Sequence, residues 1–143
     1  IHQQAAQVEL YTWRENIHGR LAEILILDQF SRNMYRDTPG AFACDSMALA
    51  LAQEAIKQAD LSDLTTTEKG FLYLPFMHSE SLVIHQEAVR LFSQPGLENQ
   101  LHFEKLHLVI LEQFGRYPHR NKALGRVSTP EELAFLEGEN SSF

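Results

Sequence analysis

Gln53-Glu54-Ala55-Ile56-Lys57 returns 33 positions later as Gln86-Glu87-Ala88-Val89-Arg90, so one pentapeptide pattern occurs twice in this chain. The match extends upstream to two further pairs, Ser46 with Ser79 and Leu49 with Leu82. Tetratricopeptide repeats recur at about 34 residues, and each repeat is a pair of antiparallel helices that stacks on the next pair. Two copies of a pentapeptide can also arise by chance. The offset nevertheless favours an all-α fold, in which antiparallel helix pairs stack as a tetratricopeptide-like right-handed superhelix.

Hydrophobic periodicity and capping residues predict helices on both sides of the repeat. A buried helix is expected from Arg20 to Phe30, and a second from Pro39 to Ala59, with the proline in its first turn. Thr65 and Glu68 have the spacing of a capping box, and we expect Pro75 to end or kink the helix that follows them. The other predicted helices are Lys69–Met77, Ser79–Phe92, Leu97–Phe114 and a short one capped by Ser128-Thr129-Pro130-Glu131-Glu132. No segment has the alternating pattern of a strand.

The composition fits a single helical domain over residues 1–143. With 143 residues, of which 44% are hydrophobic, the chain can bury a core without metal or disulfide links. The formal charge of -7 opposes binding to phosphate backbones or anionic lipids, so neither nucleic acid nor a membrane is an expected partner. Cys44 is the only cysteine and no secretory signal is visible, which predicts a cytoplasmic protein. Because the chain starts with Ile1 rather than Met, within a helix-like stretch that reaches Trp13, we expect it to lack its native N-terminal segment.

The segment from Gly115 to Val127 reads as a basic loop. It contains no acidic residue but four of the chain's 12 lysines and arginines, namely Arg116, Arg120, Lys122 and Arg126. Guanidinium groups bind carboxylates and phosphates through paired hydrogen bonds, so an anion site that includes Asn121 is one interpretation. The alternative is that these cations cap helix ends and pair with surface carboxylates, which requires no ligand.

A second polar cluster, residues 28–36, follows an otherwise apolar helix. Asp28 and Arg32 are four residues apart, and an ion pair within the helix is the simpler interpretation. The functional interpretation is that Arg32, Asn33 and Arg36 face the same cavity as the basic loop, with Asp28 orienting one guanidinium group.

A third cluster, His78-Ser79-Glu80, follows Pro75. A histidine can carry a proton near pH 7, and Glu80 can act as its partner or as a base. Surface or capping roles are the alternative. Glu104 and His107 have the Glu-x-x-His spacing of di-iron bundles, as do Glu15 and His18. Glu9 with Glu80 or Glu87 could supply the further glutamates, but His18 precedes Gly19 at a predicted helix end, which opposes such a site. Motifs for zinc, nucleotides or esterase chemistry are absent, so no metal or cofactor is expected.

Three blocks of the sequence resemble an uncharacterised bacterial family, domain of unknown function 924. They span residues 27–33 (Leu-Asp-Gln-Phe-Ser-Arg-Asn), residues 71–80 and residues 114–121, and the resemblance continues to residue 132. It implies a tetratricopeptide-like fold and no known activity. Ser31 replaces the family's proline, and a Phe-Trp-Phe-like segment expected before Ile1 is missing. His107 matches a histidine that the family places ahead of its Phe-Gly-Arg block, which adds His107 to the candidate ligand-binding residues.

Two functions of different classes remain open. In the first, a helical module binds an anionic small molecule or an acidic peptide at an Arg-, His- and Asn-rich face. In the second, an enzyme of hydrolase or isomerase type binds a small anion and uses acid–base residues. The candidate ligand-binding residues are Asp28, Arg32, Asn33, His107, Arg116, Arg120, Asn121 and Arg126, and the candidate catalytic residues are His78, Glu80 and His119. An enzyme should gather His78, His119, Arg32 and Arg120 around one cleft, whereas a scaffold should spread them along an open groove.

Overall fold

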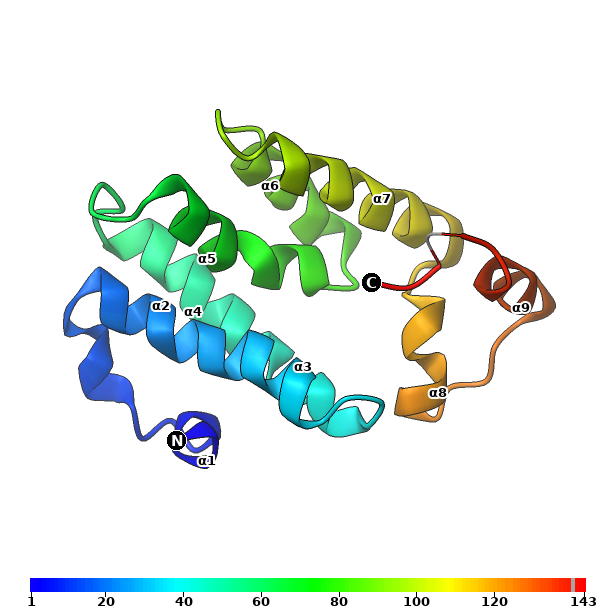
Figure 1. Cartoon of the computed structure of the whole chain (residues 1–143), viewed down its shortest axis with the longest axis horizontal. Helices are drawn as coiled ribbons and strands as arrows, with labels where there is room; N and C mark the ends of the chain where they lie inside the picture. Colours follow the sequence, from blue (N-terminus) through cyan, green and yellow to red (C-terminus); the bar gives the residue numbers. More distant parts are fainter. Residues whose placement is uncertain (140) are drawn as a thin grey trace.

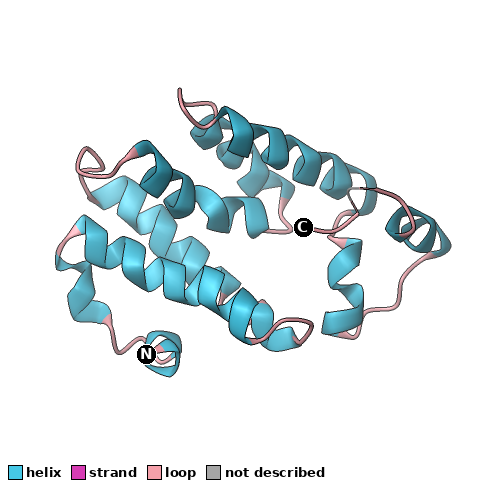
Figure 2. Cartoon of the chain, in the orientation of Figure 1, coloured by secondary structure: helices cyan, strands magenta, loops and turns pink. Residues whose placement is uncertain are grey.

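A computed structural model describes residues 1–139 and 141–143 and is all-α over those residues, with no strand among them (Figure 2). The α-helices are α1 His2–Ala6, α2 Ile17–Leu25, α3 Ser31–Met34, α4 Asp45–Gln58, α5 Thr66–His78, α6 Leu82–Phe92, α7 Glu98–Phe114, α8 Asn121–Leu124 and α9 Pro130–Leu136. Short helical turns of other types are η1 Tyr11–Glu15, η2 Ile26–Phe30, η3 Pro39–Ala41 and η4 Pro118–Arg120. Within the described residues, no helix has both the length and the hydropathy needed to cross a lipid bilayer.

Each copy of the repeated pentapeptide lies on a helix, the first on α4 and the second on α6. Their burial patterns agree, because Ala55 and Ala88 are fully buried while Lys57 and Arg90 are exposed at matching positions. Both alanines belong to the same hydrophobic core. The repeat therefore marks equivalent packing positions, and small side chains there let neighbouring helices approach closely.

The main core lies between α2, α4, α5 and α6. In Figure 1, α2, α4 and α5 lie next to one another on one side of the molecule, and α6 and α7 form the next pair. Consecutive helices from α4 to α7 contact each other along the chain. Aliphatic side chains make up most of this core, and Tyr73 and Phe92 meet edge to face within it, with ring centroids 5.9 Å apart.

The predicted helix from Arg20 to Phe30 is part of a longer helical rod that runs from Ile17 to Met34 through α2, η2 and α3. Its middle, η2, is one turn of wider π-helix. Such turns reorient side chains within a helix and often occur at functional sites. Here η2 carries Asp28, which is buried although it is ionisable.

Three expectations need correction. Residues 1–13 are not one helix, since Val8 adopts a left-handed φ of 63° between α1 and η1. Of the two effects expected of Pro75, an end of the helix is wrong, because α5 continues to His78 and the proline removes only the hydrogen bond that its own N–H would have donated. The segment from Gly115 to Val127 is not simply a loop, since it contains η4 and α8.

Both capping boxes predicted from the sequence are confirmed. Thr65 accepts a hydrogen bond from the backbone of Glu68, and Glu68 accepts one from the backbone of Thr65. Thr129 and Glu132 do the same at the start of α9. Gly115 ends α7 in the left-handed conformation, with φ of 72°, which turns the chain toward η4.

The Thr65→Ala variant should lower the free energy of unfolding by about 1 kcal/mol, because the first turn of α5 loses its side-chain acceptor. Urea denaturation measures this loss. Thr67→Ala is the matched control, as Thr67 is exposed in the same turn and caps nothing among the described residues. Equal stability of the two variants would contradict the assigned role of the cap.

Candidate functional site

A cavity of about 800 Å³ lies where the ends of distant segments meet. Its walls come from η2 and α3, from η3, from the C-terminal end of α5, from α7, and from η4 with α8. Among its lining residues are six of the predicted site residues: Arg32, Asn33, His78, His107, His119 and Arg120. The volume lies within the range of about 300–1,000 Å³ that is usual for ligand pockets.

Asp28 lies behind the cavity wall and is 1% exposed. Its Oδ1 accepts hydrogen bonds from His78 Nδ1 at 2.7 Å and from Arg32 at 3.0 Å, and its Oδ2 accepts one from Gln29 at 2.6 Å. Burial opposes the charged carboxylate, but these three partners outweigh burial and lower the pKa of Asp28 to about 2. Asp28 is therefore a charged acceptor at neutral pH.

His78 is held in one orientation by Asp28. An ionised carboxylate has no proton to give, so the proton of this hydrogen bond must be on Nδ1 of His78. Nε2 has no hydrogen-bond partner among the described residues, and the His78 side chain lines the cavity. A buried carboxylate that orients an imidazole in this way leaves Nε2 able to accept or deliver a proton.

Asp45, at the start of α4, links the two arginines of the cavity. Both of its carboxylate oxygens accept hydrogen bonds from Arg32, at 2.7 and 3.0 Å, which is the bidentate geometry favoured by guanidinium groups. The Asp45 carboxylate is 3.7 Å from Nη1 of Arg120, beyond hydrogen-bonding distance. Arg32 thus forms a bidentate pair with a carboxylate, whereas Arg120 does not.

Arg120 is buried, with 6% of its surface exposed, and its guanidinium group lies between the rings of Phe42 and Tyr117, 4.6 Å from each centroid. Within the part of the chain that the structure describes, the group makes one hydrogen bond, from Nη2 to the backbone oxygen of His78 at 2.8 Å. Nη1 is 4.0 Å from Glu80, and Nε is buried without a partner among the described residues. Burial lowers the pKa of Arg120, yet an arginine stays charged at neutral pH. Most of its five donors are therefore unused.

Glu80 and Arg126 hold the basic segment in place. Arg126 donates to both carboxylate oxygens of Glu80, at 2.9 and 3.1 Å, and the backbone N–H of Tyr117 donates to the same carboxylate at 2.6 Å. Burial disfavours the charged carboxylate, but the hydrogen bond from Arg126 outweighs it and lowers the pKa of Glu80. Asn121 is buried and accepts a hydrogen bond from Nε of Arg126 at 2.9 Å.

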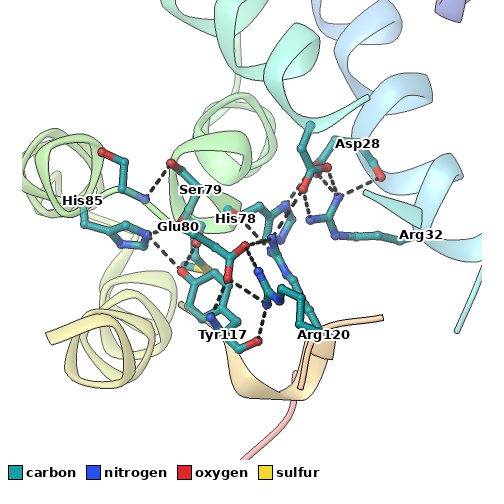
Figure 3. A network of polar contacts seen from close by, with 12 residues as sticks. Asp28, Arg32, His78, Ser79, Glu80, His85, Tyr117 and Arg120 are labelled. Carbon is teal, nitrogen blue, oxygen red and sulfur yellow. Dashed lines mark hydrogen bonds and ion pairs between the residues drawn. The ribbon is translucent and has the colours of Figure 1, made fainter. Parts of the chain in front are cut away.

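A fully buried polar cluster supports the cavity from behind. Nδ1 of His85 is 2.5 Å from Glu104, and its Nε2 is 2.7 Å from the backbone oxygen of Ser79 and 2.9 Å from the Tyr117 hydroxyl. Tyr117 donates in turn to the backbone oxygen of Met77 at 2.6 Å. Burial raises the pKa of Glu104. Figure 3 shows His85, Ser79 and Tyr117 on one side of His78 and the contacts of Asp28 and Arg32 on the other.

His107 and His119 complete the cavity wall as neutral rings. His107 bonds through Nδ1 to the backbone oxygen of Phe103 at 2.7 Å and stacks on Phe143 with centroids 3.9 Å apart. Burial lowers the pKa of His107 to about 3 and that of His119 to about 4. His119 stacks on Tyr117 at 5.5 Å, and its buried Nδ1 has no partner among the described residues.

With this geometry in view, residues 1–140 match the family model described as "Bacterial protein of unknown function (DUF924)". The chain belongs to this family. Its fold is similar to the solved structure of a protein of unknown function, ATU0120 from Agrobacterium tumefaciens, with 41% sequence identity and a TM-score of 0.90. That similarity covers 96% of this chain and 78% of the Agrobacterium chain. The comparison with curated proteins gave no match. Membership confirms the resemblance seen in the sequence and carries no activity with it.

The predicted site residues divide into two groups. Six line the cavity, and Asp28 orients two of them. Glu80, Asn121 and Arg126 do not line it and instead bond to one another. Arg116 lies elsewhere, since it donates to both oxygens of Glu132, at 2.9 and 2.7 Å, beside a separate hollow near α9. For these four residues, the pairing alternative describes the observed contacts.

Sequence reasoning missed Asp45, Phe42 and Tyr117 as partners of the arginines. Asp45 is an ordinary first-turn carboxylate in the sequence, and only the tertiary fold brings it to Arg32 and Arg120. Glu104 was considered only as a metal ligand, but it bonds to His85. The described residues contain no group of three or more His, Cys, Asp or Glu side chains that could hold a metal ion.

The stabilising effect of Asp28 should depend on pH. Its folded-state pKa of about 2 lies below the ordinary value of 3.8, so its contribution is complete above pH 4 and is lost as the pH falls toward 2. The Asp28→Asn variant should be less stable than the wild type by on the order of 2 kcal/mol at pH 6. Urea unfolding at several pH values measures this difference. A gap that stays constant from pH 6 to pH 2 would refute a strongly ionised Asp28.

The ring of His78 should carry its proton on Nδ1, because Asp28 accepts there. Long-range ¹H–¹⁵N correlation spectra of the histidine rings report which nitrogen is protonated. His102, which is exposed, provides an averaged reference in the same spectrum. A neutral His78 with its proton on Nε2 would contradict the orientation described above.

Proposed function

We propose that this protein binds a small anionic molecule in the cavity and that Arg120 is its main contact. The observation that supports this proposal is a buried guanidinium group that makes a single hydrogen bond with residues 1–139 and 141–143. Buried charges are normally paired and hydrogen-bonded, because an unpaired one loses its hydration without compensation. A bound carboxylate or phosphate would supply the missing acceptors.

Four other arginines differ from Arg120 because each forms a bidentate pair with a carboxylate. Arg14 with Glu23, Arg32 with Asp45, Arg116 with Glu132 and Arg126 with Glu80 each form two hydrogen bonds to one carboxylate. These four pairs need no ligand. Arg120 has carboxylates at 3.7 and 4.0 Å, close enough to hold its charge in place but too far to satisfy its donors.

The rim of the cavity adds polar groups from α3 and the turn after it. Asn33 and Arg36 are exposed lining residues, and neither makes a side-chain hydrogen bond or ion pair with the described residues. An exposed cation at the mouth attracts an anion before it reaches Arg120. Both side chains remain available to contact the ligand directly.

An enzyme is the second candidate, and the Asp28–His78 pair favours it. A buried carboxylate that fixes an imidazole beside an arginine is the usual geometry for acid–base catalysis on an anionic substrate. The gathering of His78, His119, Arg32 and Arg120 on one cavity fits this candidate as well. Hydrolysis or isomerisation would suit these residue types.

Arg120→Gln should abolish the stabilisation of the protein by its anionic ligand, because the main donor group is lost. Thermal shift with a panel of small carboxylates and phosphates, followed by calorimetry on the hits, measures the effect, since a ligand raises Tm by mass action. Arg90→Gln is the matched control, as it removes the same charge from an exposed site on α6.

A second variant, Arg36→Gln, tests the proposal even if Arg120→Gln does not fold. Arg36→Gln alters only an exposed side chain and should weaken binding roughly fivefold, with the unliganded Tm unchanged. The proposed function fails if no anion binds the wild type. It also fails if the hits bind Arg120→Gln and Arg36→Gln as tightly as they bind the control Arg90→Gln. Binding of an acidic peptide in place of small anions would also overturn it.

Two finer features of the sequence prediction are kept as part of this proposal. The right-handed superhelical stacking of helix pairs is supported by the matching burial of Ala55 and Ala88 on α4 and α6. A cytoplasmic place of action is supported by the single cysteine, Cys44.

A further inference from the structure

We infer that the ligand is a monocarboxylate with an apolar body, held with its acid group on Arg120 and its body against the aromatic wall of α7. This inference rests on the proposed function and narrows its ligand class. Three observations support it: the local charge balance, the geometry around Arg120 and the apolar side chains in the cavity lining.

The charges around Arg120 leave no surplus for a polyanion. Three carboxylates, of Asp28, Asp45 and Glu80, face three guanidinium groups, of Arg32, Arg120 and Arg126. At the rim, Arg36 and Asp37 add one charge of each sign. The lining rings of His107 and His119 are neutral at pH 7, because burial lowers both pKa values. A phosphate or a dicarboxylate would bring two or more negative charges into this balanced set, whereas a monocarboxylate brings one.

The geometry of Arg120 also fits one carboxylate. The guanidinium carbon of Arg120 lies 4.6 Å from the ring centroids of Phe42 and Tyr117, and its N–H donors point outward in the plane of the group. The backbone oxygen of His78 accepts a hydrogen bond from one of these donors. Because Nε is buried, a ligand carboxylate has to pair with Nη1 and with the second hydrogen of Nη2, and two parallel hydrogen bonds to a planar carboxylate are the pairing that guanidinium groups favour.

Apolar and aromatic side chains make up part of the cavity lining. Leu74 and Met77 come from α5, Phe103 comes from α7, and Phe143 stacks on His107. Phe103 and Phe143 are 41% and 50% exposed, although both line the cavity. A hydrophilic anion would leave these surfaces in water, whereas an apolar body would cover them. At about 800 Å³ the cavity has room for a body of several carbon atoms beyond the acid group.

Calorimetry with matched ligands tests the inference. The set contains 4-phenylbutyrate and decanoate as apolar monocarboxylates, 4-phenylbutyramide as the uncharged counterpart of the first, and phosphate and citrate as hydrophilic polyanions. The wild type should bind both monocarboxylates. The amide should bind at least roughly tenfold more weakly than 4-phenylbutyrate, because it cannot form the charged pair with Arg120. Phosphate and citrate should not bind measurably.

Two variants of the same helix test the apolar wall. Phe103→Gln should weaken binding of 4-phenylbutyrate roughly tenfold, because the ring loses its apolar neighbour. Val109→Gln is the control, since Val109 is 58% exposed on α7 and does not line the cavity, and it should leave binding unchanged. Both substitutions replace an exposed apolar residue, so folding should be preserved in both.

The outcomes separate this inference from the proposed function. If phosphate or citrate binds in an Arg120-dependent way and the apolar acids do not, the proposed function stands and the monocarboxylate inference fails. If the apolar acids bind Arg120→Gln and Phe103→Gln as tightly as they bind the wild type, they bind elsewhere on the protein, and the inference also fails. If no anion of the set binds the wild type, the monocarboxylate inference is overturned, and the wider anion panel decides the proposed function.

Discussion

The hydrogen bond between Asp28 and His78 joins side chains 50 residues apart and fastens the rod that contains α2 and α3 to the end of α5. A buried carboxylate tolerates its loss of water only when charged or donating partners replace it. His78, Arg32 and Gln29 donate the hydrogen bonds that replace water around Asp28. Asp45 in turn accepts two hydrogen bonds from Arg32. This chain of pairings links α3 to the start of α4 and to the end of α5, next to the cavity.

The need to pair buried charges also explains which basic residues have a structural role. Arg116 pairs with Glu132 on α9, and Arg126 pairs with Glu80 after α5. These two pairs hold the C-terminal segments around η4 and α8. Arg120 lies between them in the sequence, but its aromatic neighbours take up its faces and its nearest carboxylates stay beyond hydrogen-bonding distance. One arginine of the basic segment therefore differs physically from its neighbours, and the proposed ligand site depends on that difference.

Local signals in the sequence predicted the helices well. Both capping boxes, the glycine end of α7 and the all-α class follow from interactions within a few residues. The site was only partly predictable. Arg32 and His78 could be selected because polar residues follow apolar helices there, and Arg120 because it lies in a basic segment without acidic residues. The sequence could not separate Arg120 from Arg116. That distinction depends on Glu132 and Asp45, whose distances to the arginines are set by tertiary packing. The π-helical turn that buries Asp28 also had no local signal.

The most direct measurement of the central claim is a crystal structure of the wild-type protein with 4-phenylbutyrate bound. The account predicts a carboxylate within about 3 Å of the guanidinium edge of Arg120, with the phenyl ring against Phe103 and the Asp28–His78 hydrogen bond intact. A ligand bound on another face, with Arg120 still making one hydrogen bond, would contradict it. So would an Arg120 side chain that turns away to form a bidentate pair with Asp45 or Glu80.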